Sequence, residues 1–300
     1  MAPTLHPAQA WSGDGQLHRP ARRIVSLLPS ATEIVCALGL ADRLVAVTHE
    51  CDYPPDALAG IPRITSNLLP PEVRRSDEID AAVRAAVGTG HGLYDLDEVA
   101  LTQLEPDLVL TQELCSVCAV AYPQVLQAAR VAGGGNGPMV VSLEPHSLTD
   151  VFAIIGLVAR LAGVGERGPE LVRSLQARVN AVPRPPSRRR VAIIEWLSPL
   201  FAPGHWVPEQ IELAGGVSVF GEAGERSRES SGRPSPPRSR RSSSWACAAS
   251  TSSARLRNGT SSIRPRRSSQ CRPTALATST RSMALPMYRD PVRDWLTGWR

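Results

Sequence analysis

The stretch Arg23-Ile-Val-Ser-Leu-Leu-Pro-Ser-Ala-Thr-Glu-Ile-Val-Cys-Ala-Leu-Gly39 decides the fold. It begins with an apolar run typical of a buried strand, and Pro29 opens a helical pattern that ends at Gly39. Ser30 and Glu33 have the spacing of a capping box, which satisfies free backbone N–H groups in the first turn. A second apolar run covers 44–48. The opening unit is therefore strand, helix, strand, and it predicts a parallel sheet covered by helices.

The same alternation continues as far as residue 145. Helical spacing predicts helices over 76–88, 95–105 and 119–132, and short apolar runs predict strands over 108–111 and 139–143. These elements form a first α/β lobe, for which we expect the bounds 21–145. The preceding residues, 1–20, have no periodicity and are rich in turn formers, which indicates a flexible leader.

A long helical pattern separates this lobe from a second one. It runs from 147 to 180 and predicts a single bridging helix within 146–183, with a weak point at 163–168. A strand over 191–195 and a helix over 209–214, stopped by Gly215 and Gly216, begin a second α/β lobe within 184–229. The sequence therefore predicts two lobes, the second of them incomplete.

The final part of the chain breaks this pattern. Residues 225–300 hold sixteen of the 33 basic residues and four of the 28 acidic ones, a net charge of +12, against −7 for the first 224 residues. The composition of 230–300, rich in Ser, Arg and Pro, predicts a disordered basic tail. It lacks the interleaved aromatic residues of a nucleic-acid-binding segment, so we expect no nucleic-acid partner.

The tail also suggests a change of reading frame. The chain contains no lysine, which indicates GC-rich codons. Residues 242–255 and 279–299 give strand-like and turn-like sequences when each codon's last base is joined to the next codon's first two. We therefore hypothesise that a frameshift has replaced most of the second lobe.

The stretch 23–39, with Val45-Ala-Val-Thr-His-Glu-Cys-Asp-Tyr-Pro-Pro55 and Leu104-Glu-Pro-Asp-Leu-Val-Leu-Thr-Gln112, resembles the iron-siderophore and vitamin B12 class of ABC-transporter substrate-binding proteins. The resemblance is strongest to its cobalamin-binding subgroup and covers about 21–229. It implies two Rossmann-like α/β lobes with parallel sheets, bridged by one long helix, that hold a ligand between them. It implies cobalamin or a related corrinoid or metal chelate as the ligand, no required cofactor, and an ABC permease as the partner.

Three loops that follow predicted strands would face one groove, because ligands of parallel sheets bind beyond the carboxyl ends of the strands. Aromatic rings with a few polar groups suit a large, flat, partly apolar ligand. The candidate ligand-binding residues on or near these loops are His49, Glu50, Cys51, Tyr53, Tyr94, Gln112, Leu114, Cys115, Trp196, His205 and Trp206.

A metal site is an alternative use of the same region. Cys115 and Cys118 form a single CxxC pair, which lacks the second pair of a zinc ribbon. Cys51 and His205 complete the list of candidate metal ligands, although the thiols could equally line a packed loop. Alternative functions are accordingly a cytoplasmic metal- or haem-handling protein that uses Cys51, Cys115 and Cys118, or a non-functional frameshifted product.

Catalytic motifs are missing from the sequence. It has no Gly-x-Ser-x-Gly, no His-Glu-x-x-His and no lysine for a phosphate loop, so we expect no catalytic residues and no enzyme. No apolar stretch approaches the ~20 residues that span a bilayer. The N-terminus as written lacks a secretory signal and the six cysteines suit a reducing compartment, which favours the cytoplasm, whereas the resemblance implies a periplasmic or extracellular location. We expect a monomer.

Overall fold

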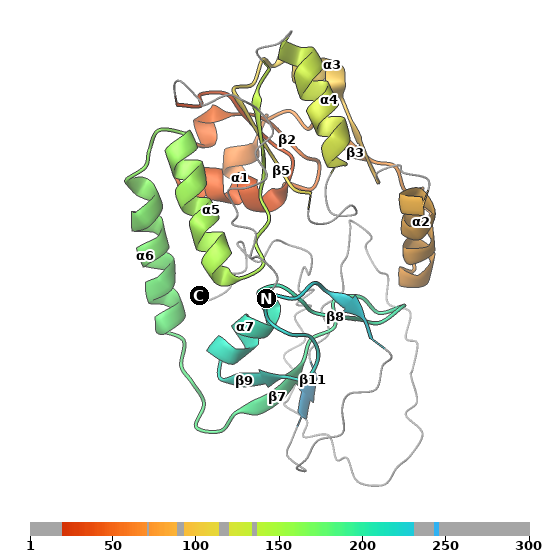
Figure 1. The fold of residues 1–300 in the computed structure, drawn as a ribbon, viewed down its shortest axis with the longest axis vertical. Coiled ribbons are helices and arrows are strands. Elements are labelled where there is room, and N and C mark those ends of the chain that lie inside the picture. The colour runs from red at the N-terminus through yellow and green to blue at the C-terminus, as the bar shows by residue number, and fades with distance from the viewer. Residues whose placement is uncertain are drawn as a thin grey trace, which may run out of the picture.

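Two lobes connected by a helix form the described part of the molecule (Figure 1). The computed structural model describes residues 20–70, 72–88, 93–113, 120–133, 137–230 and 243–245. The first lobe is built on a parallel sheet with the strand order β2-β1-β5-β6. Its strands are β1 (Ile24–Ser26), β2 (Leu44–Val47), β5 (Leu108–Thr111) and β6 (Met139–Ser142). The predicted parallel α/β fold is confirmed.

Helices cover both faces of this sheet. They are α1 (Pro29–Ala37) and α5 (Leu148–Leu161) on one face, and α3 (Glu98–Gln103) and α4 (Tyr122–Gly133) on the other. Successive strand side chains point to opposite faces. On β1, Ile24 therefore packs in one core cluster and its neighbour Val25 in the other, and both are fully buried. This burial on both faces explains why the strands are continuous apolar runs.

The start of α1 differs from the prediction. The N-cap is Leu28, and no side chain caps the helix. Pro29 is the first helical residue, where its missing N–H is not needed. Ser30 therefore lies inside the helix, and Glu33 is buried, so the predicted capping box is wrong. The predicted end is confirmed, because Gly39 takes a left-handed conformation with φ of 71° directly after the helix.

A small antiparallel pair of strands flanks the main sheet. It consists of β3 (Thr65–Asn67) and β4 (Tyr94–Leu96), with α2 (Ser76–Gly88) between them in the chain, as predicted for that helix. The helix expected over 95–105 is wrong at its start, because Asp97 caps α3 by accepting a hydrogen bond from the backbone N–H of Ala100. Short 3-10 turns, η1 (Ala41–Arg43) and η2 (Asp56–Leu58), complete this lobe.

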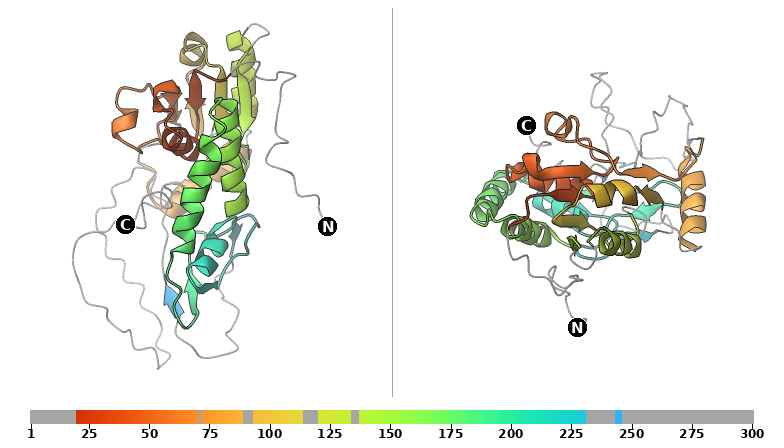
Figure 2. Two further views of the ribbon diagram at one scale, coloured as in Figure 1. Left: turned by 90° about the vertical axis from the view of Figure 1, so that its left-hand side faces the viewer. Right: turned by 90° about the horizontal axis from the view of Figure 1, so that it is seen from above.

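The bridging segment is two helices rather than one. α5 ends at Leu161, and Gly163, with φ of 67°, reverses the chain, after which α6 (Arg167–Asn180) lies alongside α5 (Figure 2). Gly168 allows the close approach, because a Cβ there would lie 3.0 Å from that of Ala159. The prediction of one helix over 147–180 is therefore wrong, and α6 alone leads to the second lobe.

The second lobe contains a three-stranded parallel sheet in the order β11-β7-β9. Its elements are β7 (Arg189–Ala192), β8 (Phe201–Ala202), α7 (Val207–Leu213), β9 (Gly216–Ser218), β10 (Arg228–Glu229) and β11 (Ser243–Trp245). β8 and β10 pair antiparallel. Within the described residues, its core cluster of buried side chains is small and consists of Ala192, Ala202 and Phe220.

The structure corrects two sequence-based predictions about the C-terminal half of the chain. The strand expected over 191–195 begins earlier, at Arg189, and ends at Ala192. The tail expected to be structureless contains β11, which pairs parallel with β7, while its remaining residues after Ser230 lie outside the described part. The predicted leader, 1–20, lies outside it too except for its last residue.

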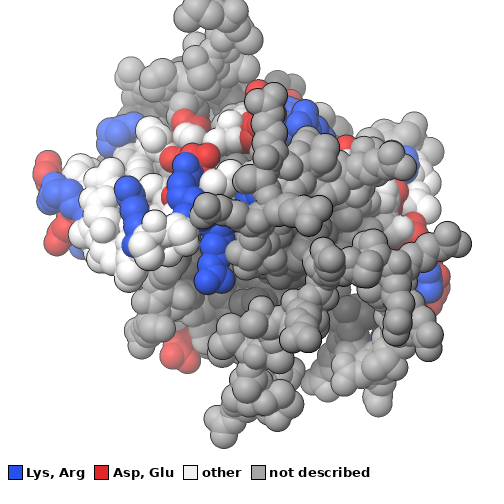
Figure 3. Space-filling view, turned by 90° about the horizontal axis from the view of Figure 1, so that it is seen from below, with Lys and Arg blue, Asp and Glu red and all other residues white. Residues whose placement is uncertain are grey.

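The underside of the molecule is the end of the second lobe farthest from the first (Figure 3). The described part of this face carries both basic and acidic side chains beside uncharged surface. Arg184 and Arg188, in the connection between α6 and β7, and Arg189, the first residue of β7, are exposed. Among the described helices, none has the length and apolar character required to cross a membrane.

Candidate functional site

The carboxyl edge of the first sheet carries a row of hydroxyl groups. Each of the four strands has a buried serine or threonine at its last residue or directly after it: Ser26, Thr48, Thr111 and Ser142. In a parallel sheet these ends meet at one edge. The chain that leaves this edge after β6 reaches the second lobe, because the backbone N–H of Leu148 donates to Glu209 Oε2 of α7 at 3.0 Å. The edge therefore faces the second lobe.

Three predicted residues come together beside this edge. His49 Nδ1 lies 2.7 Å from Thr65 Oγ1, and the His49 ring centroid lies 5.2 Å from that of Tyr94. His49 Nε2 is 3.3 Å from Glu50 Oε1 but is not oriented for a hydrogen bond with any described residue. His49, Glu50 and Tyr94 thus form one half-buried cluster in the first lobe, although they come from β4 and the loop after β2.

Cys51 does not reach this surface. It is 1% exposed, its Sγ lies 3.0 Å from Thr32 Oγ1, and it belongs to the core cluster of the first lobe. The structure thus corrects its assignment to the ligand groove and to a metal site. Leu114, Cys115 and Cys118 lie outside the described residues. Within the described part, His, Cys, Asp and Glu residues form no group of three or more that could hold a metal ion.

Two further candidate ligand-binding residues, Tyr53 and Gln112, lie in the first lobe. Tyr53 and Gln112 are half-buried, and Gln112 directly follows β5. A hollow of about 500 Å³ lies on the first lobe, but its lining comes from 63–66 and 95–99 and includes none of the predicted site residues. All of its lining residues belong to the first lobe, and one of them, Thr65, contacts His49.

An aromatic cluster occupies the junction itself. His146 follows β6 in the first lobe, and His205 and Trp206 precede α7 in the second. The His146 and His205 ring centroids lie 5.6 Å apart, and those of His205 and Trp206 lie 5.8 Å apart. The sequence predicted His205 and Trp206 as site residues but gave His146 no partner.

The loop that presents His205 is held firmly. The His205 backbone has φ of 52°, which is unfavourable for a non-glycine residue, and its N–H donates to the Glu225 carbonyl at 2.6 Å. Gly204 packs so tightly that a Cβ would contact the backbone of Ser227. Its N–H donates to Glu195 Oε1 at 3.3 Å. In the sequence, Glu195 is only the last residue of the strand predicted over 191–195, and nothing there points to its contact with Gly204.

Burial shifts the pKa of two groups in this loop. Burial raises the pKa of Glu195, and the hydrogen bonds from Ser227 and Gly204 lower it by a smaller amount. Burial also lowers the pKa of His205, and the nearby His146 and Arg226 lower it further, which favours the neutral form of the ring. His205 Nε2 and Trp206 Nε1 are buried and have no hydrogen-bond partner among the described residues. Unpaired buried polar atoms are costly, which is typical of a binding surface.

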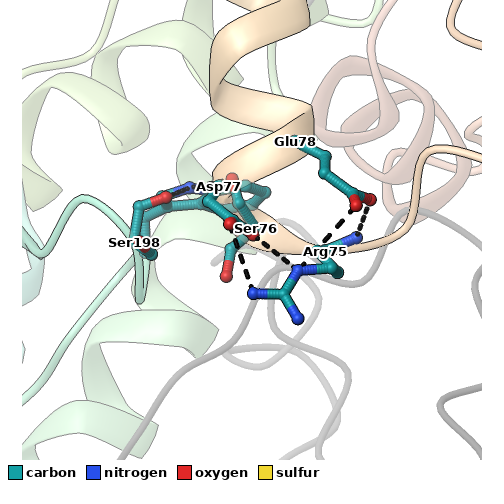
Figure 4. Close-up of polar contacts among 6 residues, drawn as sticks. Arg75, Ser76, Asp77, Glu78 and Ser198 are labelled. Carbon is teal, nitrogen blue, oxygen red and sulfur yellow. Dashed lines mark hydrogen bonds and ion pairs between the residues drawn. The ribbon is translucent and has the colours of Figure 1, made fainter.

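Trp196 makes a second contact between the lobes. Its Nε1 donates to the main-chain oxygens of Ser76, at the start of α2, and Ser198, each at 3.1 Å. Figure 4 shows Ser76 and Ser198 side by side at this junction, next to the ion pairs of Arg75. The polar atom of Trp196 is therefore engaged in holding the lobes together.

No family model matches the chain. A Vitamin B12-binding protein of Vibrio cholerae is 27% identical over 209 residues, which cover 68% of this chain and 63% of that protein. The uncharacterized ABC transporter substrate-binding lipoprotein YvrC of Bacillus subtilis is 27% identical over 165 residues, 55% of this chain and 41% of that protein. This chain thus spans less than two thirds of the length of these relatives.

A solved structure shares the fold. The periplasmic heme-binding protein HutB of Vibrio cholerae superposes with a TM-score of 0.50 and 19% identity, over 70% of each chain. This similarity supports the two-lobe α/β architecture described above.

Proposed function

We propose that this chain is a substrate-binding protein of the iron-siderophore and vitamin B12 family of ABC transporters, and that it binds cobalamin or a related corrinoid between its lobes. One observation carries the proposal. His146 of the first lobe meets His205 and Trp206 of the second at the carboxyl edge of the first sheet. The buried Nε2 of His205 and Nε1 of Trp206 have no hydrogen-bond partner within the described part of the chain.

The chemistry of this junction suits a large planar ligand. An indole and two imidazoles provide broad ring faces, and the unpaired His205 Nε2 and Trp206 Nε1 can orient polar groups at the ligand's edge. The His49, Glu50 and Tyr94 cluster adds a polar and aromatic surface in the first lobe. Loops at the carboxyl ends of parallel strands are where such folds bind ligands.

Titration of the full chain with cobalamin tests this proposal. We expect saturable one-to-one binding by calorimetry and a loss of at least tenfold in affinity for Trp206→Ala. Val99→Ser, which replaces an exposed residue on α3, serves as the control and should bind as the parent does. Haemin and a ferric hydroxamate, titrated in parallel, distinguish a corrinoid site from a site for other chelates. Absence of saturable cobalamin binding by folded protein would overturn the proposal.

The delivery role is part of the same proposal. A relative is named as an ABC transporter substrate-binding lipoprotein, which supports a permease as the partner and a location outside the cytoplasmic membrane. Pull-down of a permease reconstituted in nanodiscs, with and without cobalamin, tests it. The monomeric state and the frameshift remain predictions, and resequencing across codons 225–235 tests the frameshift.

The alternative based on cysteine ligands has weaker support. It requires Cys51 as a thiolate ligand, but this side chain packs in the core of the first lobe and contacts Thr32. Release of Cys51 would disrupt that core, so we retain the binding-protein interpretation.

A further inference from the structure

Two imidazole rings, one from each lobe, lie next to each other at the lobe junction. His146 and His205 come from different lobes, their ring centroids are 5.6 Å apart, and the ring planes are inclined by 43°. Both residues are half-buried. No hydrogen bond to another described residue occupies His205 Nε2.

The backbone fixes one member of this pair in place. Two hydrogen bonds hold His205 in its left-handed conformation, one from its N–H to the Glu225 carbonyl and one from the Gly224 N–H to its own carbonyl at 2.8 Å. Strained backbone that the surroundings enforce is concentrated at functional sites. His205 is thus held with a buried ring nitrogen that has no hydrogen-bond partner among the described residues.

We propose that His146 and His205 bind a divalent transition-metal ion of the Zn²⁺, Ni²⁺ and Cu²⁺ group and so link the two lobes. This site shares His146 and His205 with the proposed corrinoid surface, but it needs no corrinoid in order to form. Neutral imidazole is a preferred ligand of these ions, whereas Mg²⁺ and Ca²⁺ prefer oxygen ligands.

The ring separation matches a shared small ion. With metal–nitrogen distances of about 2.0–2.1 Å, the ion lies ~3.2 Å from each ring centroid, so two imidazoles at a tetrahedral angle have centroids roughly 5.2 Å apart. The observed 5.6 Å is close to this value. Two axial ligands on opposite sides of a macrocycle would need a separation of ~6.4 Å on the same bond lengths, with the flat ring between them. The pair therefore fits a small ion better than the centre of a chelate.

Water completes the coordination in this proposal. No third His, Cys, Asp or Glu joins the pair within the described part of the chain. Two protein ligands with open positions give a weaker site than a closed structural zinc site, which has four. We therefore expect exchangeable binding that strong chelators reverse.

Copper titration of the chelator-treated full chain tests the proposal. We expect saturable one-to-one Cu²⁺ binding, nitrogen hyperfine splitting from two imidazoles in the electron paramagnetic resonance spectrum, and competition by Zn²⁺ but not by Mg²⁺. His146→Asn and His205→Asn should each weaken binding at least tenfold and remove one nitrogen from the spectrum. Asparagine tolerates the left-handed backbone at position 205.

The control is a residue outside both proposed sites. Val99→Ser replaces an exposed residue on α3, and it should leave the Cu²⁺ affinity and the spectrum unchanged. Circular dichroism confirms that each variant is folded before titration. A parent chain without saturable Cu²⁺ binding, or folded His146 and His205 variants that bind as the parent does, would refute the site. Trp206→Ala, which weakens the proposed corrinoid surface but keeps both imidazoles, should retain the Cu²⁺ affinity, and this keeps the two proposals separable.

Discussion

The indole Nε1 of Trp196 donates a hydrogen bond across the lobe junction to the main-chain oxygen of Ser76, at 3.1 Å. This bond joins the loop after β7 to the first turn of α2. Two further polar contacts link the lobes: Leu148 donates to Glu209, and Arg84 of α2 pairs with Glu229 of β10 at 3.1 Å. The relative position of the lobes therefore depends on a small number of identifiable bonds.

Removal of the Trp196 N–H donor should destabilise the first turn of α2. Trp196→Phe keeps a ring but removes the N–H, and one hydrogen bond contributes about 1 kcal/mol. We expect a stability loss of that order and faster amide exchange in the first turn of α2. Hydrogen exchange with mass spectrometry measures the effect, with Leu197→Ala, at a 50% exposed neighbour, as the control. Equal exchange in both variants would show that the contact does not hold α2.

The close packing of α5 and α6 predicts a sharp difference between two glycines. A Cβ at Gly168 would lie 3.0 Å from the Cβ of Ala159, whereas a Cβ at Gly165 meets nothing within 4 Å. Gly168→Leu should therefore destabilise the protein by about 1–3 kcal/mol through overpacking, and Gly165→Leu should change little. Urea denaturation followed by circular dichroism provides the measurement. Similar midpoints for the two variants would contradict the packing described.

Glu195 should make stability depend on pH. Burial raises its pKa above the ordinary 4.5, so the folded state holds the proton more tightly than the unfolded state. Its contribution to stability is full below that ordinary value and is lost as pH rises through the folded pKa. Glu195→Gln cannot titrate, so its melting temperature relative to the parent should rise as pH increases. Melts from pH 4 to 7.5 test this, and a constant difference would refute it.

Cys36 should react slowly with thiol reagents. Burial, together with the nearby Glu33, raises the pKa of this thiol to about 11. Only the thiolate reacts, so little of the folded protein is reactive at pH 8. We expect iodoacetamide to label Cys36 much faster in urea than in buffer, as followed by peptide mass spectrometry. Equal labelling rates would show that this helix face is open.

The first lobe was largely predictable from sequence because its signals are local. Buried runs such as 108–111 are apolar on both faces, and α2 has clear helical spacing. β3 was missed because two of its three side chains are exposed and polar, so it shows no apolar alternation. The sequence indicated a weak point at 163–168 but not a complete break between α5 and α6, because apolar spacing continues across Gly163, where the left-handed backbone ends the helix.

The candidate site was only partly predictable, because its members meet across the lobe junction. His205 and Trp206 stood out through the stiff Gly and Pro residues around them, but nothing in the sequence relates His146 to His205. Cys51 was misplaced for the opposite reason. It follows a strand end, which predicts a surface position, but its contact with Thr32 turns it into the core.

Glu209 serves α5 as a cap supplied by the other lobe. Its carboxylate accepts the N–H of Leu148, the first residue of that helix, which has no acceptor within the helix. Any rotation of one lobe away from the other must leave this amide to water and remove a negative charge from the positive end of the helix dipole. The Leu148 amide is thus a built-in spectroscopic reporter, whose chemical shift would register opening of the molecule without any attached label.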